Sequence, residues 1–181
     1  MRHFYISALT LIFCFYSVNA QLGTDTFTIA SDDASTTNYP GGTWNNTTNG
    51  GSGFNTWAIS SSGGGSYIGG TGQGSPSFGL FSDGAGNFAF AERAFSRALQ
   101  SGDTFSVDLG HTATINGEIF LQFLDGTSPV LTLKFVGGDD RWRINDGGSD
   151  FDSGQLYSAN TSISFTFTYE GGNVYSYTFG A

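Results

Sequence analysis

The chain of 181 residues is poor in cysteine, proline and positive charge. It has one cysteine, three prolines and only six lysine and arginine residues, against 15 aspartate and glutamate residues. The net charge of −9 removes the electrostatic basis for binding nucleic-acid phosphates. A single cysteine, Cys14, permits no disulfide within the chain. The residues that favour helices in bundles are also scarce, which argues against an all-helical protein.

Glycine and aromatic residues are abundant instead. The chain has 28 glycines, 18 phenylalanines, eight tyrosines and three tryptophans. Glycine without a strict three-residue repeat excludes collagen, and 16% aromatic residues are too many for a disordered chain. We therefore expect a β-rich globular domain.

The first 20 residues have the pattern of an export signal. A short basic start is followed by an apolar run from Ile6 to Tyr16, and Val18 and Ala20 are small residues at cleavage positions. The run is too short to span a bilayer, which takes about 20 apolar residues. We predict a signal peptide (1–20) cleaved after Ala20, a single mature domain (21–181), and a secreted or periplasmic location without a membrane span. The alternative is that this run is a buried strand or helix of the core.

Much of the remaining chain alternates between apolar and polar residues. This period of two is typical of strands with one buried and one solvated face. The alternating segments are Phe105 to Leu109, Leu131 to Val136, Ser162 to Tyr169 and Tyr175 to Phe179. The segment Glu118 to Leu124 is apolar on both faces apart from Gln122, which predicts a central strand covered on both sides.

Short turns separate these strands. Asp125-Gly126, the segment 137–140 and the segment 170–173 are rich in glycine, aspartate and asparagine, which suit tight hairpins. Connections this short join antiparallel neighbours, so the fold class expected is all-β, a two-layer antiparallel β-sandwich. Ala89 to Leu99 is predicted as an edge strand, with a short helix as the alternative. Ser31 to Gly53 and Ser60 to Ser77 are predicted as long loops.

The order of several short motifs resembles a known superfamily. The motifs are Asp32-Asp33-Ala34-Ser35, Tyr39, Gly41-Gly42, Trp44, Asn49-Gly50-Gly51-Ser52-Gly53-Phe54, Trp57, Ser66-Tyr67-Ile68-Gly69, Ser77-Phe78-Gly79-Leu80-Phe81, the segment 102–108 and Ile144-Asn145-Asp146. In this order they resemble bacterial secreted domains of the concanavalin A-like lectin/glucanase superfamily. The resemblance implies a jelly-roll sandwich on surface or secreted proteins, but no set of binding residues. Members of this type usually continue further, so we expect a sandwich that is incomplete at its C-terminal end.

Catalytic motifs are lacking. Glucanases of this superfamily carry a Glu-x-Asp-x-x-Glu strand that places its acids on one face. Here Glu92, Glu118 and Glu170 are isolated. His111, the one histidine after residue 20, lies in a turn and is expected to be solvated. With no nucleophile elbow and no phosphate loop, we expect a non-catalytic protein. A glycosidase assembled from distant acids is the least favoured alternative.

Acidic residues are densest between residues 137 and 154. The spacing of Asp146, Asp150 and Asp152 suggests a calcium site, because calcium prefers several hard oxygen ligands. The alternative is that these aspartates, with Asp139 and Asp140, are only turn formers. No other cofactor is predicted.

Exposed aromatic residues beside amides are the candidates for sugar binding. A ring covers the apolar face of a pyranose, and amides bind its hydroxyls. The candidates are Trp44, Asn45, Asn46, Tyr67 and Tyr157, whereas Trp57 and Trp142 lie in strand patterns and are expected in the core. For Trp44 the alternative is a ring that pins its loop to the sandwich.

The function expected is a secreted, non-catalytic module that binds a polysaccharide or cell-surface glycan, or mediates surface contact, through its loops. The alternative is a structural or assembly module that is completed by strand pairing with another chain.

Overall fold

The computed structural model describes residues 2–8, 10–15, 18–22, 25–70, 76–111 and 116–180. These residues contain no α-helix and one short 3₁₀ turn, η1 (Pro40–Gly42). The strands are β1 (Arg2–Ala8), β2 (Thr10–Phe15), β3 (Val18–Leu22), β4 (Asp25–Ala30), β5 (Ala58–Ser62), β6 (Gly64–Gly69), β7 (Ser77–Ser82), β8 (Phe88–Ala94), β9 (Thr104–Gly110), β10 (Glu118–Asp125), β11 (Ser128–Val136), β12 (Arg141–Asn145), β13 (Phe151–Leu156), β14 (Ser162–Gly171) and β15 (Val174–Gly180).

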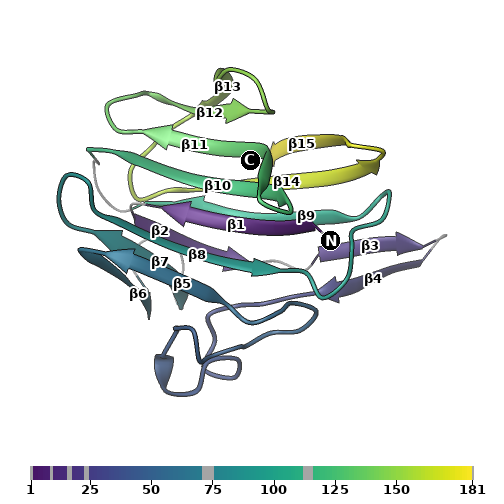
Figure 1. Ribbon diagram of the computed structural model, residues 1–181, viewed down its shortest axis with the longest axis horizontal. Helices are drawn as coiled ribbons and strands as arrows, with labels where there is room; N and C mark the ends of the chain where they lie inside the picture. The colour runs from purple at the N-terminus through teal and green to yellow at the C-terminus, as the bar shows by residue number, and fades with distance from the viewer. Residues whose placement is uncertain are drawn as a thin grey trace.

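The strands form two large antiparallel sheets and a small one (Figure 1). The seven-stranded sheet has the order β13-β12-β11-β10-β1-β8-β5, and the six-stranded sheet has the order β15-β14-β9-β2-β7-β6. A separate two-stranded sheet consists of β3 and β4. The prediction of an all-β fold with antiparallel pairing is confirmed. The meander predicted for the C-terminal half is confirmed for β10 to β13, whereas β14 and β15 form a hairpin in the other large sheet.

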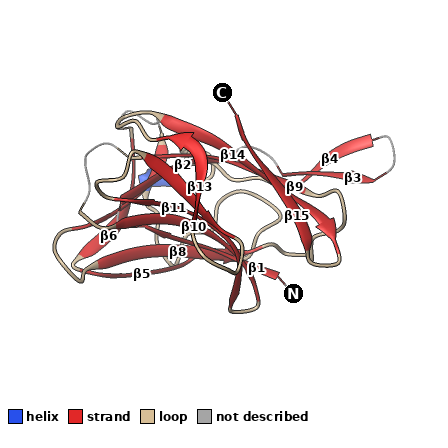
Figure 2. Cartoon of the chain, turned by 90° about the horizontal axis from the view of Figure 1, so that it is seen from above, coloured by secondary structure: helices blue, strands red, loops and turns tan. Residues whose placement is uncertain are grey.

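The core lies between the two large sheets, which face each other (Figure 2). Alternate residues of β10 (Ile119, Leu121 and Phe123) are buried, as the period of two predicts. Phe123 stacks on Phe167 of β14, in the opposite sheet, with 4.3 Å between the ring centroids. Aromatic contacts of this kind join the two layers. Trp57 and Trp142 belong to the same core, as predicted.

Three expectations for individual segments are corrected. Ala89 to Leu99 contains strand β8, but β5 pairs with its outer side, so β8 is not an edge. Ser60 to Ser77 is not one long loop, because β5 and β6 occupy much of it; residues 71–75 lie outside the described part. The central strand β10 is covered on one face only, since Phe120 and Gln122 on its outer face remain partly exposed.

The N-terminal residues form the middle of both large sheets. β1 lies between β8 and β10, and β2 lies between β7 and β9. Figure 1 shows β1 as the purple strand beside β10. This placement corresponds to the alternative in which the apolar run contributes strands to the fold. Cleavage after Ala20 stays a prediction, and a chain cleaved there would lack β1 and β2.

Candidate functional site

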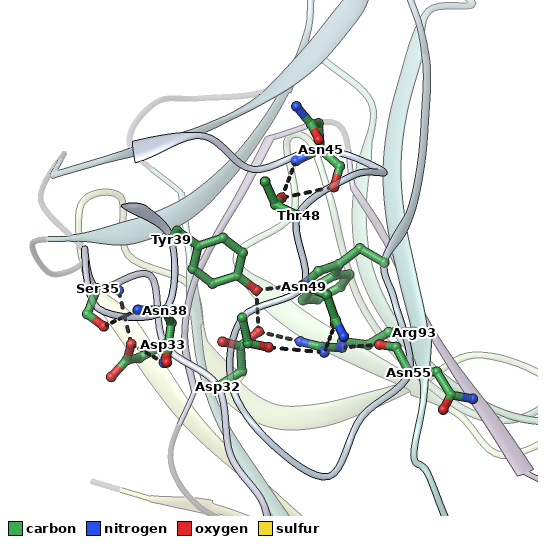
Figure 3. Close-up of polar contacts among 12 residues, drawn as sticks. Asp32, Asp33, Ser35, Asn38, Tyr39, Asn45, Thr48, Asn49, Asn55 and Arg93 are labelled. Carbon is green, nitrogen blue, oxygen red and sulfur yellow. Dashed lines mark hydrogen bonds and ion pairs between the residues drawn. The ribbon is translucent and has the colours of Figure 1, made fainter. Parts of the chain in front are cut away.

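A polar network lies buried where the loop after β4 crosses β8 (Figure 3). Arg93 of β8 donates hydrogen bonds to the Asp32 carboxylate, to Asn49 Oδ1 at 2.8 Å and to the Asn55 carbonyl at 3.1 Å. The Tyr39 hydroxyl donates to Asp32 Oδ2 at 2.6 Å. Arg93 is 6% exposed and Asp32 is 2% exposed, so this ion pair is closed to solvent.

Aromatic rings and glycines complete this network. The Arg93 guanidinium lies 4.5 Å from the Phe54 ring centroid and 4.6 Å from that of Trp57. Trp57 Nε1 also donates to the Tyr39 hydroxyl at 2.8 Å. At Gly53, which has a φ of +73°, a Cβ would lie 2.0 Å from the Ile29 carbonyl oxygen, so only glycine fits. The motif residues between 32 and 57 therefore attach the long loop to β8.

The electrostatics of this network are those of a structural ion pair. Burial raises the pKa of Asp32, while the hydrogen bond from Tyr39 and the charge of Arg93 act in the opposite direction. Burial lowers the pKa of Arg93, and the Asp32 charge opposes that change. Because these groups are almost fully buried, the network can hold the loop in place but is not placed to meet a substrate.

Trp44 is not the exposed ring that sugar binding would need. It is 3% exposed and packs edge-on against Trp57, with 5.2 Å between ring centroids, and against Phe78 at 4.7 Å. This corrects the sugar-stacking expectation and agrees with the alternative, a ring that pins its loop. The neighbouring amides are exposed but engaged: Asn45 Oδ1 accepts from the Thr47 backbone at 2.8 Å, and Asn46 Nδ2 donates to the Ile59 carbonyl at 3.0 Å.

Tyr67 lies on β6 rather than in a loop, and its ring is partly exposed. The ring covers Gly79 of β7, where a Cβ would lie 2.2 Å from the Tyr67 Cζ atom. Phe81, which is 43% exposed, lies beside it with 6.2 Å between centroids. These two rings form a small aromatic surface on the outer face of the six-stranded sheet.

Tyr157 stacks on the edge of the core. Its ring lies 3.9 Å from Phe135 and 4.7 Å from His111 between centroids, and its hydroxyl is 3.2 Å from His111 Nδ1. His111 was expected to be solvated, but its exposure is 0%. Burial lowers the pKa of His111 to about 4. The expectation failed because the aromatic partners of His111 are distant in the sequence.

The three aspartates proposed for calcium do not converge. Within the described residues, no three His, Cys, Asp or Glu side chains are grouped as metal ligands. Asp150 pairs with Lys134 at 2.5 Å and accepts from Asn145 at 3.0 Å, and Asp152 lies 3.6 Å from Arg141. Two of the three acids thus pair with cations of the chain itself, and the calcium site stays a prediction that the geometry does not favour.

An open groove crosses the outer face of the seven-stranded sheet, over β10, β11 and β12. It has a volume of about 310 Å³. Its lining comprises Glu118, Phe120, Gln122, Pro129, Thr132, Lys134, Asn145 and Asp150. The groove follows from alternation: Ile119, Leu121 and Phe123 of β10 are buried, so Phe120 and Gln122 between them face outward.

Polar contacts position the groove side chains. Gln122 Nε2 donates to Thr132 Oγ1 at 3.2 Å, across β10 and β11. Lys134 Nζ lies 2.5 Å from Asp150 and 4.0 Å from Glu118, so one cation holds two carboxylates. Sequence reasoning missed this site because its residues come from several strands and a turn. The usable indication was Phe120, a large apolar residue at an outward position of β10.

Comparison with known proteins gives no assignment. The chain matches no family model, no curated protein and no solved structure. In the part of the chain described here, no helix has both the length and the apolar character to cross a membrane.

Proposed function

We propose that this protein is a secreted, non-catalytic module of the concanavalin A-like jelly-roll type, and that it binds carbohydrate in the groove of the seven-stranded sheet. The observation that carries the proposal is the composition of the groove. A partly exposed aromatic ring, Phe120, is surrounded by amide, hydroxyl and charged side chains. The site proposed here lies on a sheet face and not in the loops that the sequence indicated.

The chemistry of the groove suits a sugar. An aromatic ring can cover the apolar face of a pyranose, which is worth roughly 2 kcal/mol at about 25 cal/mol per Å². Gln122 and Asn145 can both donate to and accept from hydroxyl groups, and Asp150 can accept from them. A groove near the lower end of the usual ligand-pocket range of about 300–1,000 Å³ has room for a short part of a glycan. One ring alone gives weak binding, so a repeating polysaccharide that engages several molecules is the expected ligand.

The same groove suits binding better than hydrolysis. A glycosidase needs one carboxyl group that keeps its proton to deliver it to the leaving group. The hydrogen bond from Lys134 lowers the pKa of Asp150, which therefore stays ionised at neutral pH. Glu118 faces the same ammonium group at 4.0 Å. Lys134 thus favours the ionised form of Asp150, which acts as a hydrogen-bond acceptor.

The test is affinity electrophoresis of the full chain against a panel of soluble polysaccharides. With a polysaccharide that retards the protein, Phe120→Ala is expected to weaken binding about tenfold or more. Phe81→Ala is the matched control, because it removes an exposed ring from the opposite sheet and is expected to leave retardation unchanged.

Two results would contradict this assignment. A folded chain that is retarded by none of the polysaccharides would remove the carbohydrate function. Weaker binding in Tyr67→Ala and Phe81→Ala, with normal binding in Phe120→Ala, would move the site to the aromatic surface of β6 and β7.

A further inference from the structure

One N-terminal segment supplies a central strand to each of the two large sheets. β8 and β10 each pair with β1, and β7 and β9 each pair with β2. β1 and β2 are one residue apart in the sequence, and they belong to different sheets. We call the two strand positions that β1 and β2 occupy, between β8 and β10 and between β7 and β9, the slot.

The residues that pair with β1 and β2 in the flanking strands belong to the core. Ala91 of β8 and Leu121 of β10 pair in register with Ile6, and both are buried. Phe78 of β7 and Leu109 of β9 pair in register with Phe13, and both are buried as well. The slot therefore borders the hydrophobic core in both sheets.

An empty slot would lower the stability of the fold. Four strands would lose the partners of their backbone N–H and C=O groups, and these groups satisfy their hydrogen bonds almost without exception in folded proteins. Unpaired edges with apolar inward rows recruit further strands. The register also defines what fits: apolar residues at every second position, as in Phe4, Ile6 and Ala8 opposite β10.

We propose that the slot is a binding site for an extended apolar segment of another polypeptide, with the length and alternation of residues 2–15. A chain cleaved after Ala20 lacks these residues, and the donated segment then adds one strand to each sheet by β-augmentation. This inference rests on the predicted cleavage and is independent of the carbohydrate groove. The partner that we propose is a polypeptide that donates strands, and not a second small ligand.

The first test keeps the full chain and cuts it after folding. A site for a specific protease is placed between β3 and β4, and the folded protein is cleaved there. We call the larger C-terminal fragment the body. Native mass spectrometry is expected to show the N-terminal fragment still bound, with one copy per body. An isotope-labelled synthetic peptide of the same sequence should replace it, whereas a scrambled peptide of equal composition should not.

Two outcomes of this test overturn the proposal. If the fragment leaves and the body melts at an unchanged temperature, the slot closes by itself and needs no donor. If two bodies associate without the fragment, a second copy of the chain fills the slot instead.

The second test needs no inserted site. In the intact chain, amide hydrogen exchange in β8 and β10 is expected to be as slow as exchange in β11, because β1 pairs with both strands. Ile6→Pro removes a backbone donor in the middle of β1 and should speed exchange in both neighbours, whereas Ile6→Val, the matched control, should not. Fast exchange in the unmodified β8 and β10 would show that the slot holds no strand, and would overturn the proposal.

Discussion

Two groups of ion pairs differ sharply in their surroundings. The Arg93–Asp32 pair lies inside the molecule, where aromatic rings and loop backbone surround it. The second group lies on the outer face of the seven-stranded sheet and comprises Lys134, Arg141 and Arg143 with their aspartate partners. Half of the six basic residues of the chain are in this second group. Similar residues therefore form a structural anchor in one region and an accessible polar surface in the other.

The difference decides what each group can do. Removing one partner of a buried ion pair costs about 3–5 kcal/mol, because the other charge stays buried without compensation. An exposed pair contributes about 0–1 kcal/mol, because water solvates its partners almost equally well. Exposed pairs can therefore exchange their partner for a ligand at little cost in stability, and the buried pair cannot.

The largest effect is expected from Arg93→Met. It leaves the Asp32 carboxylate buried opposite an apolar side chain, so the free energy of unfolding should fall by about 3–5 kcal/mol. Urea-induced unfolding, followed by tryptophan fluorescence, measures the change. Arg143→Met is the matched control on the exposed face and should change the value far less, because water solvates both partners of its ion pair.

A double variant sharpens this result. Asp32→Asn keeps the size of the side chain and removes the negative charge, so Arg93→Met with Asp32→Asn should recover part of the lost stability. Equal losses in Arg93→Met and Arg143→Met would show that the two regions do not differ in the way proposed.

A second large effect is expected from Gly53→Ala, in the loop that holds Arg93. The φ of +73° disfavours any side chain, and the added Cβ would lie 2.0 Å from a backbone carbonyl oxygen, so a loss of about 2–4 kcal/mol is expected. Gly42→Ala provides the control, since Gly42 has a φ of +68° and nothing within 4 Å. Thermal unfolding of both variants separates crowding from backbone strain, and equal losses would mean that crowding contributes nothing.

Local patterns predicted the strands well and the site poorly. The alternation in segments such as Ser162 to Tyr169 depends on neighbouring residues, so it could be recognised without knowing the fold, and the hairpin turns followed from their own glycine and aspartate residues. Trp44 is buried because it packs against Trp57 and Phe78, and no local sequence pattern shows that these rings are in contact. The groove depends on the pairing of β10, β11 and β12. Alternation predicts which side chains face outward, but it does not predict which strands are neighbours.

His111 provides a third test, on a buried group that titrates. Its folded-state pKa of about 4 lies below the ordinary value of 6.5, so its neutral form is favoured by folding. The contribution of neutral His111 to the free energy of unfolding is complete above pH 6.5 and is lost as the pH falls toward 4. The free energy of unfolding should fall by roughly 2 kcal/mol between pH 7 and pH 5. Urea unfolding of the wild type and of His111→Gln at several pH values checks this expectation. The variant should lose less stability over that interval, whatever its stability at pH 7, and parallel pH profiles would contradict the assignment.

The smallest effect on stability, and the most informative for function, is expected on the exposed face. Lys134→Met removes the cation that joins Asp150 and Glu118, and a loss of about 1 kcal/mol or less is expected, with a smaller loss for Arg141→Met, whose partners are 3.6 Å and 3.9 Å away. In Lys134→Met the pKa of Asp150 should rise toward its ordinary value, because Lys134 is the main cause of its lowering. An NMR titration of the carboxyl carbon measures this change. If Lys134→Met alters polysaccharide retardation while stability barely changes, the exposed ion pairs serve recognition; if both stay unchanged, they are only solvated surface charges.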